Sequence, residues 1–209
     1  MNQRDRDSKA TTPCELIGWE KFNELARSLA GQLKDAGEAV DIIIAIGRGG
    51  YMPARILSDL LGIMNLATFK IEHYHGTHKS EEAFIRYPLV AEVENQRVLL
   101  VDDVSDSGDT FHVAVEHIHS RGDPGQIKTA VLHHKTVSTF VPDYYAAVVK
   151  QWRWIIYPWA VTEDLAVLIS GLQAATSDPE TIRHMLMENH GIEPSDVQIR
   201  DALVLLSQA

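Results

Sequence analysis

Hydrophobic and polar residues alternate along the chain in blocks that predict strands and helices in turn. Two uninterrupted apolar runs, at residues 40–46 and 98–101, are typical of strands that are buried on both faces. The strands of one sheet are predicted at residues 40–46, 65–72, 98–101, 127–133 and 146–150. Helical spacing of apolar residues predicts helices at residues 14–36, 52–61 and 111–119. This order favours an α/β fold, with a mainly parallel, twisted sheet flanked by helices.

The end of the chain has a different pattern. Helical pieces are predicted at residues 165–172, 179–189 and 196–206. We therefore expect a disordered N-terminus at residues 1–12, a core at residues 13–160 and a helical C-terminal extension at residues 161–209. A helix-turn-helix is an alternative for part of the extension. Its acidic composition favours helices that pack on the core or on another subunit.

Composition narrows the classes of partner. The chain has 209 residues, a net charge of −10 and 45% hydrophobic residues, which is typical of a globular domain rather than a nucleic-acid or anionic-membrane binder. It has one cysteine, Cys14, which cannot form an internal disulfide and so fits a reducing compartment. No apolar run reaches membrane-spanning length, and the polar start is unlike a signal peptide. We expect a soluble cytoplasmic protein with no nucleic-acid or membrane partner.

The stretch at residues 97–110 carries the strongest chemical signal. Its apolar strand ends in Asp102 and Asp103, and small residues follow before a helix. A strand, a tight loop and a helix N-terminus direct backbone N–H groups and the helix dipole at one point, which suits a phosphate. The two acids would repel a bare phosphate, so the ligand should also carry hydroxyls or a divalent cation. The residues alone leave open a receiver-like or hydrolase strand end, or a generic phosphate loop.

A second loop of this kind follows the strand at residues 40–46. Its sequence is Gly47-Arg48-Gly49-Gly50, and Pro53 stands in the first turn of the helix after it. Glycines allow a close backbone approach, and the guanidinium adds a positive charge. The glycines could also serve only a sharp strand-to-helix turn. Two phosphate loops on neighbouring strands suit a ligand with a phosphate group at each end.

Residues 98–110 resemble the phosphoribosyl-pyrophosphate (PRPP) motif of the type I phosphoribosyltransferases. That motif is an apolar strand, two acids, a short spacer and a Ser/Thr-Gly-x-Thr loop, and every defining position matches. The resemblance implies that Asp102 and Asp103 hold the ribose hydroxyls and also bind Mg²⁺, the cofactor. It further implies a 5′-phosphate cradle made by Asp106, Ser107, Gly108, Asp109 and Thr110, and a pyrophosphate loop made by Gly47, Arg48, Gly49 and Gly50.

The following segments resemble the 6-oxopurine enzymes of that family. Lys135 ends the strand at residues 127–133, and the resemblance implies that it contacts the purine O6. The run at residues 154–159 resembles their base-stacking segment, so that Trp154 would stack on the purine and the Ile155 backbone would meet its edge. Lys135 could instead be a surface lysine, and the tryptophan-rich run could be core packing or a partner patch.

One position departs from the pattern of these enzymes. Ala160 stands where the family commonly has an acid that helps to bind guanine or xanthine. This departure favours hypoxanthine, although Glu163 or Asp164 could substitute for the missing acid.

A polar loop is predicted at about residues 73–89. It contains His73, His75 and His78, whose irregular spacing argues against a metal site. In the resembled family this position holds a flexible hood over PRPP, for which Tyr74 and Lys79 are candidates.

The resemblance implies transfer of phosphoribose from PRPP to a 6-oxopurine, with Mg²⁺, by a homodimer or higher homo-oligomer. The products would be a nucleoside 5′-monophosphate and pyrophosphate. Asp106 would accept the proton from N7 of the base, and Arg48 would stabilise the leaving pyrophosphate. The alternatives are a PRPP-sensing regulator without activity, a transferase for another base, and an interaction module whose tryptophan-rich run, including Trp152 and Trp154, forms an interface.

Overall fold

The computed structural model describes residues 12–73, 83–172 and 177–208, which form two compact units. The larger unit spans residues 20–152, and the smaller one combines the N-terminal segment up to Trp19 with residues 153–209. Within the described residues, no helix is both long enough and apolar enough to cross a membrane.

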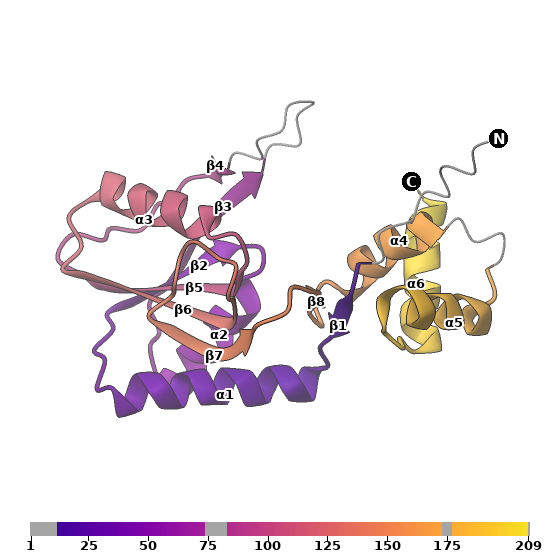
Figure 1. The fold of residues 1–209 in the computed structure, drawn as a ribbon. Coiled ribbons are helices and arrows are strands. Elements are labelled where there is room, and N and C mark those ends of the chain that lie inside the picture. Colours follow the sequence, from indigo (N-terminus) through magenta and orange to yellow (C-terminus); the bar gives the residue numbers. More distant parts are fainter. Residues whose placement is uncertain (1–11, 74–82, 173–176, 209) are drawn as a thin grey trace, which may run out of the picture. The chain divides into compact units, whose positions relative to one another are not determined.

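A six-stranded sheet forms the centre of the larger unit (Figure 1). Its order is β4-β3-β2-β5-β6-β7, and every neighbouring pair is parallel except β3 and β4. The strands are β2 (Ile42–Gly47), β3 (Leu66–His73), β4 (Ala83–Tyr87), β5 (Arg97–Ser105), β6 (Gln126–Lys135) and β7 (Tyr144–Val149). The inner strands β2 and β5 have long apolar runs because helices cover both faces of the sheet.

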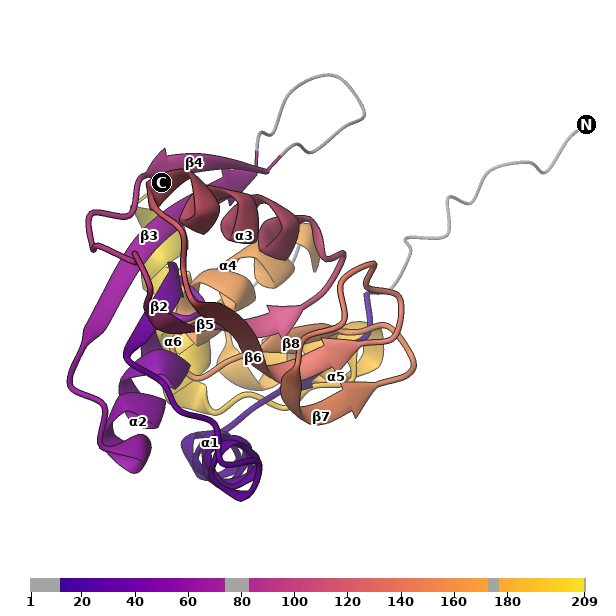
Figure 2. The same ribbon diagram turned by 90° about the vertical axis from the view of Figure 1, so that its left-hand side faces the viewer.

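Helices flank this sheet on both faces (Figures 1 and 2). They are α1 (Trp19–Asp35), α2 (Tyr51–Leu61) and α3 (Asp109–Arg121). Phe111, Ala114 and Ile118 of α3 are buried in one core with alternate residues of β2 and β5. This arrangement confirms the α/β fold with a mainly parallel sheet, and the predicted strands and helices of the core are all present.

In the described part of the smaller unit there are a short two-stranded sheet and three helices. Its strands β1 (Cys14–Leu16) and β8 (Trp154–Ile156) pair in parallel. The helices α4 (Val161–Leu172), α5 (Pro179–His190) and α6 (Asp196–Ser207) share one apolar core with both strands. Asp178 caps α5, and Ser195 and Gln198 form a capping box on α6, which fixes where these helices begin.

Three details differ from the expectations. Cys14–Leu16 is a strand and not the first turn of the helix, which begins at Trp19. Ala83–Tyr87, expected within a flexible loop, is a strand that pairs antiparallel with β3 at the edge of the sheet. The chain divides before Arg153 rather than after residue 160, because β8 pairs with β1 and shares the core of the C-terminal helices.

Candidate functional site

The candidate site lies at the carboxyl edge of the larger sheet. β2 ends at Gly47, β5 carries Asp102 and Asp103 near its end, and β6 ends at Lys135. These three strands are parallel neighbours with β5 in the middle, so the loops that follow them leave the sheet at the same edge. Ligands of open α/β sheets bind at this edge.

The loop after β5 requires a glycine at one position. Gly108 has φ of 101°, in the left-handed region that other residues rarely adopt, and α3 begins directly after it. A Cβ at Gly108 would lie 2.6 Å from the backbone nitrogen of Phe140 and 2.7 Å from Thr139 Oγ1. The loop therefore fits closely against the chain between β6 and β7.

That neighbouring segment, residues 138–140, supports the phosphate loop through hydrogen bonds. The backbone N–H and the hydroxyl of Thr139 both donate to the Ser107 carbonyl, at 2.8 and 2.9 Å. The hydroxyls of Ser105 and Ser138 lie 2.8 Å apart, and the ring of Phe140 stacks on Phe111 with 4.9 Å between centroids. Sequence reasoning missed this support, because its residues match no motif and reach the loop only through the pairing of β5 with β6.

The loop after β2 touches the two acids of β5. A Cβ at Gly49 would lie 2.5 Å from Asp103 Oδ2, and a Cβ at Gly50 would lie 2.4 Å from the carbonyl oxygen of Val101. The Gly47–Arg48 peptide is cis. Arg48 is an exposed residue. The structure thus brings the predicted pyrophosphate loop directly beside the predicted ribose-binding acids.

Asp102 is the buried member of the acidic pair. Burial, and then the charge of Asp103, raise the pKa of Asp102 well above its ordinary value, although the N–H groups of Asp103 and Gly50 hydrogen bond to it and act in the opposite direction. A site that disfavours the buried charge to this extent is suited to a cation or a hydroxyl donor that would compensate it.

The acidic pair fits Mg²⁺. Among the described residues, no three or more His, Cys, Asp or Glu side chains gather as a metal cage. Mg²⁺ ordinarily needs one or two carboxylates, with water and substrate phosphates as its other ligands. Asp102 and Asp103, next to a pyrophosphate loop, match that donor set.

Asp106 and Lys135 form an ion pair across the site. Lys135 Nζ donates to Asp106 Oδ2 at 2.6 Å, and Trp152 Nε1 donates to Asp106 Oδ1 at 3.1 Å. The Lys135 ammonium also lies 4.6 Å from the centroid of the Trp152 ring. The Lys135 side chain is only 2% exposed, whereas that of Asp106 is 37% exposed. Lys135 is therefore no surface lysine.

The other predicted base-binding residues belong to the smaller unit. Trp154 is exposed, and Ile155 is buried in β8 and pairs with Glu15 of β1. Ala160 accepts a backbone hydrogen bond from Asp164 at the start of α4. Glu163 and Asp164, the candidates for the missing acid, stand in the first turn of that helix.

His73 contacts the predicted phosphate loop. Its Nε2 lies 3.2 Å from Thr110 Oγ1, so the end of β3 reaches the start of α3. Tyr74, His75, His78 and Lys79 lie outside the described residues, and the hood prediction that rests on them remains a prediction.

A mainly parallel α/β sheet with two such loops at its carboxyl edge has the architecture of the type I phosphoribosyltransferases. Residues 16–164 match the family model of the phosphoribosyl transferase domain, and the chain belongs to this family. It is 30% identical over 144 residues to a xanthine-guanine phosphoribosyltransferase of Gluconobacter oxydans, covering 68% of this chain and 82% of that one.

Two solved structures are similar as well. A purine phosphoribosyltransferase from Pyrococcus horikoshii is 33% identical with a TM-score of 0.62, covering 70% of this chain and 93% of that one. A hypothetical protein from Neisseria gonorrhoeae with bound ppGpp is 29% identical with a TM-score of 0.60, covering 71% of this chain and 89% of that one.

Proposed function

We propose that this protein transfers phosphoribose from PRPP to a 6-oxopurine, with hypoxanthine as the favoured base, and releases pyrophosphate. The reaction forms the bond between the purine N9 and the ribose C1 and breaks the bond between C1 and the pyrophosphate oxygen. As implied by the family resemblance, the proposal includes a Mg²⁺ requirement, a cytoplasmic location and a homo-oligomer.

The observation that carries the proposal is the pairing of Asp106 with Lys135. A hydrogen-bond acceptor and a buried donor stand side by side, 2.6 Å apart. A 6-oxopurine with its proton on N7 presents the complementary pair, since N7–H donates and the adjacent O6 accepts. Adenine in the same N7–H form keeps that donor but presents an amino group in place of O6, so a donor would face the donor Lys135.

The remaining residues have roles in the same reaction. Asp106 would accept the N7 proton as N9 attacks, so that the product base is neutral. Arg48 and the N–H groups of the Gly47–Gly50 loop would stabilise charge on the leaving pyrophosphate. Asp102 and Asp103 would hold the ribose hydroxyls and Mg²⁺, which would neutralise charge on the pyrophosphate. Trp154 and Ile155 would bind the base through its ring face and edge.

The preference for hypoxanthine rests on Ala160. A methyl group offers no acceptor for the amino group of guanine and no hydrogen bond for the second oxygen of xanthine. The Gluconobacter relative, whose name includes xanthine and guanine, keeps both bases in the test.

The test is pyrophosphate release from PRPP with hypoxanthine, guanine, xanthine, adenine and uracil in parallel. We expect turnover with oxopurines, highest with hypoxanthine, and a loss of ~10²–10⁴-fold in Asp106→Asn, as for removal of a general base. Asp123→Asn, which alters an exposed acid outside the site, is the matched control. PRPP binding without turnover of any base would instead support the sensor.

The similarity to the Neisseria protein with bound ppGpp supports a second role for this site, which is to bind ppGpp as an inhibitor. ppGpp combines a guanine base with diphosphate groups, which suits a site that has both an oxopurine reader and two phosphate loops. We expect ppGpp to inhibit competitively with PRPP, and a non-competitive pattern in initial-rate kinetics would place its binding elsewhere.

A further inference from the structure

Trp152 contacts both Asp106 and Lys135 but belongs to none of the matched motifs. It follows β7, whose last residue, Val149, is the register partner of Lys135. The Thr136 N–H donates to the Val149 carbonyl at 3.1 Å, so the chain after β7 stays beside the end of β6. The pairing of two parallel strands thus delivers Trp152 to the site.

Trp152 makes a different contact with each member of the pair. Its indole N–H donates to Oδ1 of Asp106, while Oδ2 of the same carboxylate accepts from Lys135. The Lys135 ammonium lies over its ring, 4.6 Å from the ring centroid, which is within the range of a cation–π interaction. The three side chains therefore form a closed triangle in which each one contacts the other two.

A packing role accounts poorly for these contacts. Trp152 is 43% exposed, so its indole gains less from burial than a core tryptophan does. Its hydrogen-bonding group and its ring face are instead directed at two charged groups of the site.

The contact with Asp106 has a clear physical use. The terminal torsion of an aspartate is broad, so a partly exposed carboxylate with one partner would sample many orientations. A second donor on the other oxygen fixes the plane of the carboxylate. The donor–acceptor pair is then formed before the base arrives, which lowers the entropic cost of binding.

We propose that Trp152 is a positioning residue of the base site: its N–H orients Asp106 and its ring holds the Lys135 ammonium, so that the two read the N7 and O6 edge of an oxopurine together. This inference rests on the proposed function. By this inference, a residue outside the family motifs supports base binding and proton transfer rather than PRPP binding.

Two substitutions separate the contributions of the indole. Trp152→Phe keeps an aromatic face but removes the N–H, and Trp152→His restores a ring N–H donor. Tyr144→Phe is the matched control, since it also removes a donor to a carboxylate, Glu38, but at the first residue of β7 and so at the opposite edge of the sheet from the site. Thermal unfolding of each variant verifies that it remains folded.

We expect Trp152→Phe to lower kcat/KM for the oxopurine roughly tenfold, the loss that follows from removing a hydrogen bond to a charged group. The KM for PRPP should stay within about twofold of the wild-type value, because the phosphate loops keep their backbone donors. Trp152→His should recover part of the loss, and Tyr144→Phe should behave as wild type. An unchanged Trp152→Phe enzyme, an equal loss in Phe and His, or a parallel rise in the KM for PRPP would overturn the inference.

A failure of the proposed function is distinguishable from a failure of this inference. If the wild-type protein turns over no base, the transferase proposal fails. The positioning role is then tested by tryptophan fluorescence, because Trp152 contacts the groups that would bind the base. The emission of Trp152 is the difference between the wild-type and Trp152→Phe proteins. A change in this difference on adding hypoxanthine supports the positioning role, and no change overturns it.

Discussion

A Cβ atom placed on Gly49 would lie 2.5 Å from the Asp103 carboxylate, so the loop after β2 touches the acidic pair of β5 at this residue. The methyl group of Gly49→Ala would displace the end of a flexible side chain, which should cost little stability. The displaced carboxylate, however, is one that would hold the ribose. We predict that the KM for PRPP rises about tenfold or more, equivalent to ~1.4 kcal/mol, with a small change in Tm. Steady-state kinetics and thermal unfolding measure both.

Gly31→Ala is the control, since a Cβ there meets nothing within 4 Å and alanine is the better helix former in α1. It should raise stability by up to about 1 kcal/mol and leave the KM for PRPP unchanged. A Gly49→Ala enzyme with wild-type PRPP kinetics would show that Asp103 does not need its observed position.

Gly50→Ala should give the opposite division of effects. Its Cβ would meet backbone atoms, 2.4 Å from the Val101 carbonyl and 2.7 Å from the Ile46 carbonyl. Backbone of two buried strands cannot move aside, so this variant should lose stability by roughly 1–3 kcal/mol, as for an overpacked core. Urea denaturation compares it with Gly49→Ala, and equal stability of the two variants would contradict the assignment.

The sheet could be predicted from the sequence because its signals are local. Strands β2 and β5 are uninterrupted apolar runs, and each leads into a glycine-rich or small-residue loop. Such patterns define an element without knowledge of its neighbours. The edge strand β4 was missed because it has only five residues and none of them is buried, so it lacks the apolar run of an inner strand.

Other features depend on residues that are far apart in the chain. No local pattern marks the three residues of β1 as a strand, and their pairing with β8 makes them one. In the same way, Asp106 and Lys135 were assigned separate roles, and the register of β5 with β6 brings them within 2.6 Å. The tryptophan-rich run drew attention to Trp152, but no local pattern separates a site contact from packing.

The ion pair predicts an asymmetry in stability. Asp106→Asn removes the negative charge that lies 2.6 Å from the buried ammonium of Lys135, whereas Lys135→Met removes the buried charge and leaves a carboxylate that is 37% exposed and can be hydrated. We expect Asp106→Asn to lower the free energy of unfolding by about 3 kcal/mol, and Lys135→Met to change it by about 1 kcal/mol or less.

Urea denaturation at pH 7 tests this asymmetry, with the double variant as control. Asp106→Asn combined with Lys135→Met removes both charges of the pair and should be more stable than Asp106→Asn alone. Equal losses in the two single variants would contradict the burial argument.

Metal removal should stop the proposed reaction. With Asp102 and Asp103 as the carboxylates available to a cation, chelation by EDTA should abolish pyrophosphate release, and added Mg²⁺ should restore it. Asp103→Asn should raise the Mg²⁺ concentration needed for half-maximal rate. Full activity in EDTA would exclude the metal requirement.

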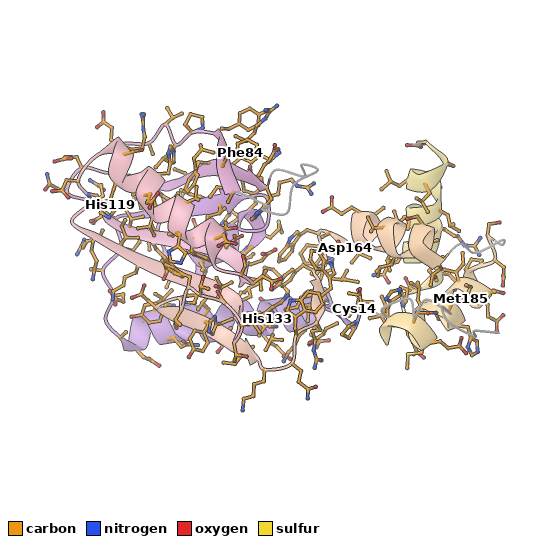
Figure 3. All side chains as sticks on the ribbon, turned by 45° about the horizontal axis from the view of Figure 1, so that its top comes forward. Cys14, Phe84, His119, His133, Asp164 and Met185 are labelled. Carbon is orange, nitrogen blue, oxygen red and sulfur yellow. The ribbon has the colours of Figure 1, made fainter. Side chains whose placement is uncertain are left out.

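His133 should make stability depend on pH. This buried residue of β6 (Figure 3) has its pKa lowered from 6.5 to about 4 by burial and by the positive charges of Lys21 and Lys135. Between these values the unfolded chain binds the proton and the folded chain does not, so stability is full above about pH 6.5 and is lost as pH falls toward 4. At about 1.4 kcal/mol per pKa unit, the loss is on the order of 3 kcal/mol.

His133→Gln removes this ionisation, so its free energy of unfolding should fall less between pH 6.5 and 4 than that of the wild-type protein. His119→Gln is the matched control, because His119 is exposed on α3 (Figure 3) and should keep the wild-type pH dependence. Urea denaturation at pH steps across this range measures all three proteins. Because the carboxylates titrate alike in each of them, the difference between the His133→Gln and wild-type curves isolates the histidine. Parallel curves would mean that His133 binds its proton as readily in the folded as in the unfolded chain.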